Sequence, residues 1–250
     1  MSTATESSTA RVFIQPGFAW DGQEAYLFDI DGTLMRNRDR IHADAFASGV
    51  RRVLDHEISL AGVAVHGSTD TAILHEACLR AGIPAGSLAE KERAILKAIS
   101  EEVAARRAEM IPVLMPGVEA VLGHLAARGA LLGLATGNLE SVGWLKMEVA
   151  GLRQWFRFGG FSDRFPIRSE LIGHAAEVAR QMAGPEARVC VVGDTPRDIA
   201  AAHANGLPVV AIATGNFSFE ELLAHQPEVC ASSLADLLAA TPNGTGGGPS

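Results

Sequence analysis

Short runs of apolar residues recur along the chain and predict five buried β-strands. They cover residues 26–29 (YLFD), 131–136 (LLGLAT), 158–161 (FGGF), 189–193 (VCVVG) and 209–213 (VVAIA). Runs that are apolar on both faces are typical of strands in a parallel sheet that helices cover on both sides. The pattern therefore predicts an α/β fold with a Rossmann-like parallel sheet as its core.

Between these runs, apolar residues return at the three- and four-residue spacing of helices. Residues 117–128 and 169–182 carry such stripes, and residues 218–221 (SFEE) form a capping box that begins a further helix. Helices that alternate with strands place one layer on each face of the sheet, as the predicted fold requires.

The alternation breaks after the first strand. Residues 36–112 show no convincing strand but three helical patterns, at 43–56, 70–81 and 88–110, the last with a capping box at 87–90 (SLAE). A single crossover helix needs far fewer residues than this stretch contains. We therefore expect an inserted helical domain, with hinges near 35–38 and 111–116.

This insertion defines the expected domain organisation. The α/β core is predicted to consist of residues 25–35 and 113–240, which enclose the helical insertion at 36–112. A Ser/Thr-rich extension at 1–24 is expected to be partly disordered, and residues 241–250 (TPNGTGGGPS) are expected to form a flexible tail.

Charge and cysteine content narrow the possible classes of protein. The net charge of −8 argues against a nucleic-acid-binding protein, and Cys78, Cys190 and Cys230 lack the spacing of zinc or disulfide frameworks. No apolar run reaches the roughly 20 residues that span a bilayer, and the first ten residues do not resemble a secretory signal. We expect a cytoplasmic protein without nucleic-acid or membrane partners, as a monomer or homodimer.

Two carboxylates follow the first predicted strand directly. Asp29 and Asp31 belong to the string YLFDIDGTL at 26–34. Ligands of parallel sheets bind beyond the carboxyl ends of the strands. Two acids this close together repel each other unless a cation compensates, and Mg²⁺ prefers oxygen ligands. The string therefore predicts an acidic, magnesium-binding crevice.

The segment DIDGTL at 29–34 resembles the first motif of the haloacid dehalogenase-like (HAD) superfamily. The resemblance implies that Asp29 is a nucleophile and Asp31 a general acid/base. This is chemically coherent, because a carboxylate can attack phosphorus to form an aspartyl-phosphate. A second carboxylate can protonate the leaving alkoxide and then activate water.

The segment ATGN at 135–138 fits the second motif of the same superfamily. The resemblance implies that Thr136 helps to hold the transferring phosphoryl group, with Gly137 and Asn138 completing an anion site at a helix start. The same four letters recur at 213–216, where turn chemistry explains them. Their order along the chain selects Thr136.

A cation and a second acidic strand end complete the resemblance. Arg168, rather than Arg164, is expected to take the place of the lysine that most members use, because the segment after Lys146 contains no lysine. GDTPRD at 193–198 has the form of the fourth motif and implies that Asp194 binds Mg²⁺ directly and Asp198 directly or through water. The implied metal ligands are Asp29, Asp31 (through its backbone carbonyl), Asp194 and Asp198.

The insertion resembles the helical cap of phosphoglycolate phosphatase-like members of the superfamily. Such a cap is implied to close over the site, exclude water and contact the leaving group. HGSTD at 66–70 is similar to their substrate-facing loop, which often has lysine where this chain has Ser68. The same letters also fit a helix start capped by Ser68 or Thr69.

Together, these motifs imply a Mg²⁺-dependent phosphatase that acts on a small phosphorylated metabolite through an aspartyl-phosphate. A phosphomutase similar to β-phosphoglucomutase has the same core motifs and stays an alternative. A third reading is a non-enzymatic phospho-acceptor domain, but the insertion and the string DGT at 31–33 count against it.

Overall fold

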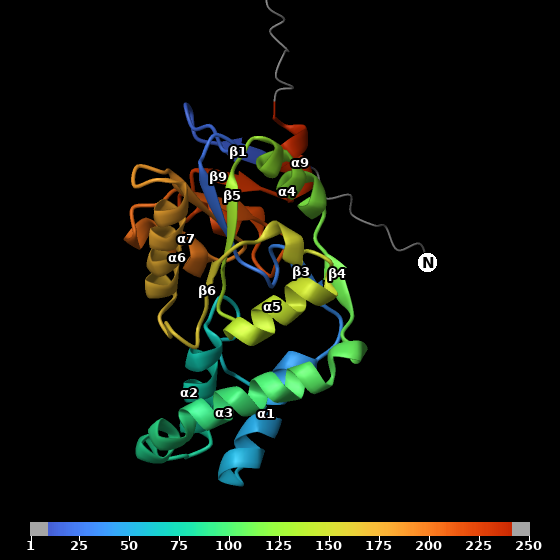
Figure 1. The fold of residues 1–250 in the computed structure, drawn as a ribbon, viewed down its shortest axis with the longest axis vertical. Coiled ribbons are helices and arrows are strands. Elements are labelled where there is room, and N and C mark those ends of the chain that lie inside the picture. The colour runs from blue at the N-terminus through green and yellow to red at the C-terminus, as the bar shows by residue number, and fades with distance from the viewer. Residues whose placement is uncertain (1–9, 242–250) are drawn as a thin grey trace, which may run out of the picture.

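The computed structural model describes residues 10–241. Within them, the core is a seven-stranded sheet in the order β1–β9–β8–β7–β2–β5–β6, with every neighbouring pair parallel except β1 and β9 (Figure 1). The strands are β1 (Val12–Ile14), β2 (Ala25–Phe28), β5 (Leu131–Ala135), β6 (Gly159–Gly160), β7 (Val189–Gly193), β8 (Val209–Ile212) and β9 (Val229–Ala231). The predicted α/β fold with a Rossmann-like parallel sheet is confirmed.

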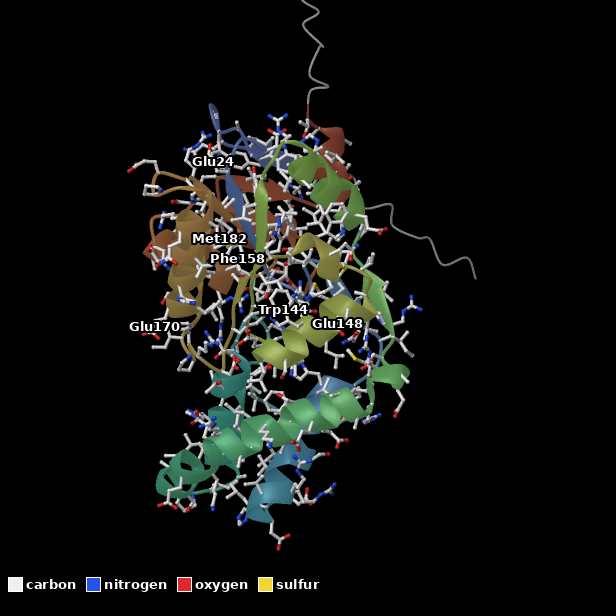
Figure 2. All side chains as sticks on the ribbon, in the orientation of Figure 1. Glu24, Trp144, Glu148, Phe158, Glu170 and Met182 are labelled. Atoms are coloured by element: carbon white, nitrogen blue, oxygen red, sulfur yellow. The ribbon has the colours of Figure 1, made fainter. Side chains whose placement is uncertain are left out.

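Helices cover both faces of the sheet, because alternate residues of its strands bury apolar side chains on opposite sides. Tyr26 and Phe28 of β2 belong to one apolar cluster, and Ala25 and Leu27 to the other. The first face is covered by α4 (Val118–Ala127), α5 (Glu140–Val149) and α9 (Leu234–Ala239). The second is covered by α6 (Arg168–Ala183), α7 (Pro196–Ala204) and α8 (Phe219–Leu223). Side chains fill the space between these layers, Phe158 among them (Figure 2).

The insertion forms a third cluster of its own. Helices α1 (Ile41–Leu54), α2 (Asp70–Arg80) and α3 (Ala85–Ala105) share a buried apolar core, to which Val142 of α5 and Leu139, just before it, contribute. The chain enters through β3 (Met35–Asn37) and returns through β4 (Pro112–Leu114), which pair antiparallel. In Figure 1 these helices lie beyond the end of the sheet where β6 and α5 are labelled.

Several boundaries differ from the sequence prediction. The expectation of no strand in 36–112 is wrong at its ends, where β3 and β4 lie, and β1 and β9 were not predicted. Each of these four strands has three residues, too few to show an alternation of apolar and polar positions. The capping box at 87–90 is also wrong, because α3 begins at Ala85 after Pro84, with no side-chain cap; proline's fixed φ suits that position. The capping box of Ser218 and Glu221 is confirmed.

Two short 3₁₀ turns, Arg107–Glu109 and Arg153–Trp155, complete the described elements. The predicted disorder at the N-terminus and the predicted flexible tail fall, at 1–9 and 242–250, outside the described residues. Among the helices between residues 10 and 241, none is long and apolar enough to cross a membrane.

Candidate active site

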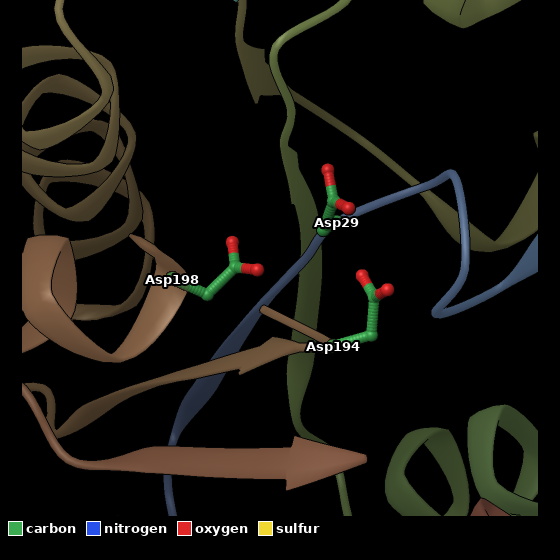
Figure 3. A group of neighbouring side chains, drawn as sticks. All are labelled: Asp29, Asp194 and Asp198. Carbon is green, nitrogen blue, oxygen red and sulfur yellow. The ribbon is translucent and has the colours of Figure 1, made fainter. Parts of the chain in front are cut away.

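Three buried aspartates meet at the carboxyl ends of two neighbouring strands. Asp29 follows β2, Asp194 follows β7, and Asp198 lies in the first turn of α7. One carboxylate oxygen of each lies within 4.8 Å of the others (Figure 3). The parallel pairing of β2 with β7 produces this cluster, because it brings both strand ends to the same edge.

The carboxylate of Asp198 is fully engaged by neighbouring donors. Its Oδ2 accepts hydrogen bonds from the backbone N–H of Thr195 (3.0 Å) and from the Thr195 hydroxyl (2.7 Å), which closes a capping box on α7. Its Oδ1 accepts from Nε (2.9 Å) and Nη2 (2.5 Å) of Arg168. Asp198 thus anchors both the helix start and the guanidinium.

Arg168 lies between the aspartates. It is the first residue of α6 and is 9% exposed, with Nη2 3.0 Å from Asp29 Oδ1. Burial disfavours its charged form, but Asp198 and Asp29 outweigh that effect and raise the pKa of the guanidinium. Arg164, the alternative cation, is exposed and lies 3.7 Å from Glu140 instead.

The acidic cluster has more negative charge than its one cation balances. Burial raises the pKa of Asp29, although Arg168 opposes the shift. Burial, with the nearby charge of Asp29, also raises the pKa of Asp194. Within the described residues, the only hydrogen bond to the Asp194 carboxylate comes from the Thr33 hydroxyl, at 3.2 Å. Buried carboxylate oxygens with free lone pairs and raised pKa values fit a divalent cation well.

Two glycines make room for Asp194. A Cβ on Gly32, whose φ is +96°, would lie 2.2 Å from Asp194 Oδ2, and a Cβ on Gly215 would lie 1.7 Å from the same atom. Gly215 belongs to the second ATGN segment, whose Thr214 hydroxyl donates to the Gly32 carbonyl (2.6 Å). Turn chemistry alone is therefore a wrong explanation of this segment, since tertiary contact requires its glycine.

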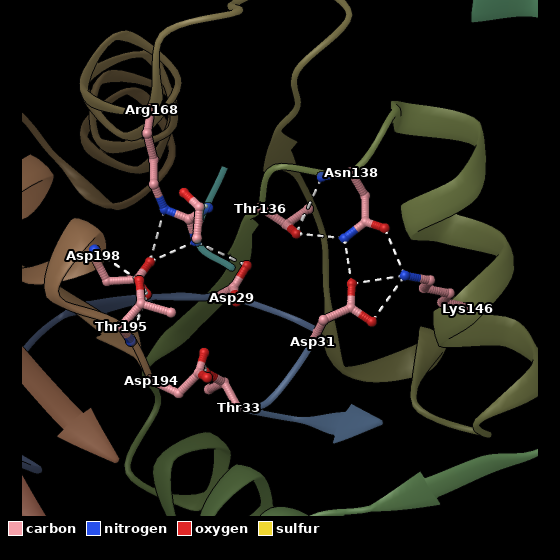
Figure 4. Close-up of polar contacts among 11 residues, drawn as sticks. Asp29, Asp31, Thr33, Thr136, Asn138, Lys146, Arg168, Asp194, Thr195 and Asp198 are labelled. Atoms are coloured by element: carbon pink, nitrogen blue, oxygen red, sulfur yellow. Dashed lines mark hydrogen bonds and ion pairs between the residues drawn. The ribbon is translucent and has the colours of Figure 1, made fainter. Parts of the chain in front are cut away.

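Asp31 has a separate environment (Figure 4). Its side chain is 46% exposed and is not part of the three-aspartate cluster. Lys146 Nζ lies 2.8 Å from its Oδ1 and 2.6 Å from its Oδ2, and Asn138 Nδ2 donates to Oδ2 at 2.8 Å. Burial opposes ionisation, but Lys146 and Asn138 outweigh it and lower the pKa of Asp31.

The predicted phosphate-binding segment lies beside these groups, but its side chains are partly occupied. Asn138 also donates to the Thr136 hydroxyl (2.8 Å) and accepts from Lys146 Nζ (2.7 Å). The Gly137 carbonyl accepts from the backbone N–H of Asp70 in the helical insertion (2.7 Å). Thr136 is completely buried. The backbone N–H of Thr136 donates to the Gly160 carbonyl (3.1 Å) and that of Asn138 to the Thr136 hydroxyl (3.4 Å), so in this segment the Thr136 hydroxyl proton and the Gly137 N–H stay available for an anion.

Sequence reasoning missed Lys146, His42 and Asp70. His42 Nδ1 lies 3.2 Å from Lys146 Nζ, and its Nε2 lies 3.0 Å from Asp70 Oδ2. Lys146 shares the buried face of α5 with Val142 and Gly143. Because lysine is almost never buried without a partner, a lysine at helical spacing on an apolar face was the available signal.

A cavity of about 780 Å³ lies between the strand ends and the helical insertion. Asp29, Asp31 and Asp194 line it from the core, and Phe46 and His66 line it from the insertion. The lining also includes Arg36, Asn37, His42, Ile73, Met115, Thr136, Lys146, Arg168 and Asn216.

The loop at 66–70 crosses from the insertion to the core. Thr69 rather than Ser68 caps α2, accepting from the backbone N–H of Ala72 at 3.2 Å. The Gly67 carbonyl accepts from Arg168 Nη1 at 3.1 Å, and Asn216 Nδ2 lies 2.7 Å from His66 Nδ1. The loop therefore covers the acidic cluster from the side of the insertion.

Comparison with known proteins places this geometry in a family. The family model for haloacid dehalogenase-like hydrolases matches residues 23–206. A phosphoglycolate phosphatase of Mesorhizobium japonicum is 33% identical over 100 residues, 40% of this chain and 44% of the relative. The phosphoglycolate phosphatase of Escherichia coli K12 is 30% identical over 152 residues, which are 61% of this chain and 60% of the relative. The chain thus spans less than two thirds of these relatives' lengths.

Solved structures show the same fold. A predicted phosphoglycolate phosphatase from Haemophilus somnus superposes with a TM-score of 0.61 at 18% identity, covering 87% of this chain and 97% of that one. A hydrolase from Pseudomonas syringae gives a TM-score of 0.61 at 16% identity, with the same coverage. Since the family model matches well over half of the chain and includes both acidic strand ends, the chain belongs to the haloacid dehalogenase-like hydrolase family.

Proposed function

We propose that this protein is a Mg²⁺-dependent phosphatase that hydrolyses a small phosphorylated metabolite through an aspartyl-phosphate on Asp29. The observation that carries the proposal is the division of charge in the site. Asp29 lies beside Arg168 and close to Asp194, whereas Asp31 is held by a different cation, Lys146. Two carboxylates in two environments can perform two different tasks.

The metal would be held by carboxylates of Asp29 and Asp194 and by the backbone carbonyl of Asp31. Asp198, whose oxygens already accept four hydrogen bonds, would act through water. When bound, Mg²⁺ would screen the repulsion between the phosphoryl group and the nucleophile. The raised pKa values of Asp29 and Asp194 support this assignment, because a divalent cation supplies the charge that the cluster lacks.

In the first step, a carboxylate oxygen of Asp29 attacks phosphorus as the bond from phosphorus to the leaving oxygen breaks. A phosphoryl group bound beside Asp31 adds negative charge, which opposes the effect of Lys146 and favours the protonated carboxyl. Asp31 donates that proton to the leaving oxygen, and Arg168 balances charge on the phosphoryl group. In the second step, Asp31 accepts a proton from water, the resulting hydroxide attacks phosphorus, and the bond to Asp29 breaks. Inorganic phosphate leaves, and Asp31 is protonated again.

The helical insertion, 36–112, is proposed to act as a cap. Its loop at 66–70 reaches the acidic cluster, and its helices line the cavity that would hold the leaving group. Exclusion of bulk water would leave the aspartyl-phosphate exposed to the one water that Asp31 positions. The curated relatives are phosphoglycolate phosphatases, so phosphoglycolate is the first candidate substrate; Ser68, where such phosphatases often have lysine, is the departure that bears on this choice.

A panel of phosphorylated metabolites, assayed for phosphate release with Mg²⁺ and with excess chelator, tests the proposal. We expect release that chelation abolishes and that Asp29→Asn eliminates, because the amide cannot form the acyl-phosphate. Asp31→Asn should slow turnover by about 10²–10⁴-fold. Isomerisation of a sugar phosphate without phosphate release would indicate the phosphomutase instead. Full activity in Asp29→Asn would refute the mechanism.

A further inference from the structure

A second cation lies in the site, and the mechanism above gives it no task. Lys146 comes from α5, and its side chain is 2% exposed. Removing an ammonium group from water is costly, so a buried lysine requires partners. Its four polar neighbours are both oxygens of Asp31, Oδ1 of Asn138 and Nδ1 of His42. Every partner therefore lies at the cavity.

A simple structural ion pair does not account for this arrangement. Asp31 is half exposed, so water could hydrate its carboxylate without a buried cation beneath it. The chain instead buries the lysine and leaves the acid accessible. Asn138 joins the two, because it accepts from Lys146 and donates to Asp31 Oδ2. The three groups form a closed triangle, which fixes the direction of the carboxylate (Figure 4).

The two oxygens of Asp31 are not equivalent in this triangle. Oδ2 accepts from both Lys146 (2.6 Å) and Asn138 (2.8 Å), which uses its two lone pairs. Oδ1 accepts from Lys146 alone, at 2.8 Å, and keeps one lone pair free. Oδ1 is therefore the oxygen that can exchange a proton with a group in the cavity.

His42 supports the lysine from the opposite side. Its Nε2 faces the Asp70 carboxylate at 3.0 Å, and its Nδ1 faces Lys146 Nζ at 3.2 Å. The ammonium group has no lone pair, so any hydrogen bond between the two runs from Nζ to Nδ1. The imidazole limits where Nζ can lie, and Nζ in turn limits where Asp31 can lie.

We propose that Lys146 is a positioning residue, which with Asn138 holds Asp31 by Oδ2 and presents Oδ1 to the leaving-group oxygen and then to water. This inference rests on the proposed function, because it assigns Asp31 the proton transfer. Lys146 touches none of Asp29, Arg168 and Asp194 among the described contacts, and it meets Asp31 at the side chain rather than at the backbone carbonyl assigned to the metal. Its main effect should therefore be on proton transfer.

The test is a kinetic double-mutant cycle on the full chain. Lys146→Met should lower kcat by about 10²-fold, the loss typical of a catalytic group displaced by about 1 Å. KM and the rise in Tm on adding Mg²⁺ should not change. In the Asp31→Asn background, Lys146→Met should cause no further loss of kcat, because the group that it positions is already inactive. Lys97→Met, which removes an exposed lysine on α3, is the matched control and should behave as wild type.

Each outcome decides one of the two proposals. If Lys146→Met lowers kcat by the same factor with and without the Asp31 carboxylate, or raises KM instead, the positioning role is wrong. If wild type releases no phosphate from any substrate, the proposed function fails. In that case, the Tm values of the same single and double variants test the contact between Lys146 and Asp31. Asp31→Asn should lower Tm by leaving Lys146 buried without its anion, and adding Lys146→Met should restore Tm. Additive losses of Tm would overturn the inference.

Discussion

Replacing Arg168 by methionine tests whether one guanidinium holds the acidic cluster together. The arginine is 9% exposed and donates to Asp198 through Nε and Nη2, while Nη2 lies 3.0 Å from Asp29. Methionine fills much of the volume but supplies no charge and no donor. Asp198, which is fully buried, would keep its carboxylate with only the Thr195 donors to stabilise it.

The size of the effect follows from this burial. Removing one partner of a buried ion pair costs about 3–5 kcal/mol, because the remaining charge stays desolvated. For a chain of this size, each kcal/mol corresponds to about 2–4 °C, so Tm should fall by about 6–20 °C. The loss should be smaller in acid, since Asp29, whose pKa is raised to about 6 by burial, takes up a proton there and removes part of the unpaired charge.

Thermal and urea unfolding at neutral pH, in chelator, measures this loss. The double variant Arg168→Met/Asp198→Asn should recover most of it, because the buried charge is then absent. Arg164→Met provides the matched control: that arginine is exposed and lies 3.7 Å from Glu140, so its removal should cost less than about 1 kcal/mol. If Arg168→Met lost no more than this control, or if the double variant lost the sum of the single losses, the buried-pair reasoning would be refuted.

Three further predictions concern the same cluster. Without metal, the difference in free energy of unfolding between wild type and Asp29→Asn should fall as pH rises from 3.8 to about 6, because the pKa of Asp29 is raised to about 6 and the folded wild type retains a proton that the unfolded chain has lost. Urea titrations of both proteins measure this difference, and a difference independent of pH would contradict the assignment. Mg²⁺ at 100 times its Kd should stabilise the folded protein by about 3 kcal/mol and raise Tm accordingly. In a thermal-shift assay, Asp194→Asn should lose this rise in Tm, and an unchanged rise would exclude Asp194 as a ligand. Gly215→Ala should abolish the rise in Tm on adding Mg²⁺, because its Cβ would lie 1.7 Å from Asp194 Oδ2. Gly86→Ala, whose Cβ meets nothing within 4 Å, should retain that rise. A rise retained in both variants would show that the loop around Gly215 shifts to make room for the Cβ, and would contradict the prediction.

The sequence alone determined the parallel strands around β2 and the acidic edge of the sheet. A strand buried on both faces leaves a continuous apolar run, and the residue after that run must emerge at the edge of the sheet. Asp29 and Asp194 each follow such a run, so their convergence required only that β2 and β7 pair in parallel. The presence of an inserted helical segment at 36–112 was also predicted from the sequence, because this stretch is longer than any crossover connection.

Tertiary structure alone decided which partner each buried polar group received. Hydrophobic periodicity records that the face of α5 with Lys146 is buried, but not that Asp31, 115 residues earlier, lies against it. The same holds for His42, which reaches the lysine from α1, and for Gly215, where a Cβ would clash with the side chain of Asp194. Which face of an element is buried can be predicted from the spacing of apolar residues along that element. A hydrogen-bond partner instead depends on how two distant elements are brought together.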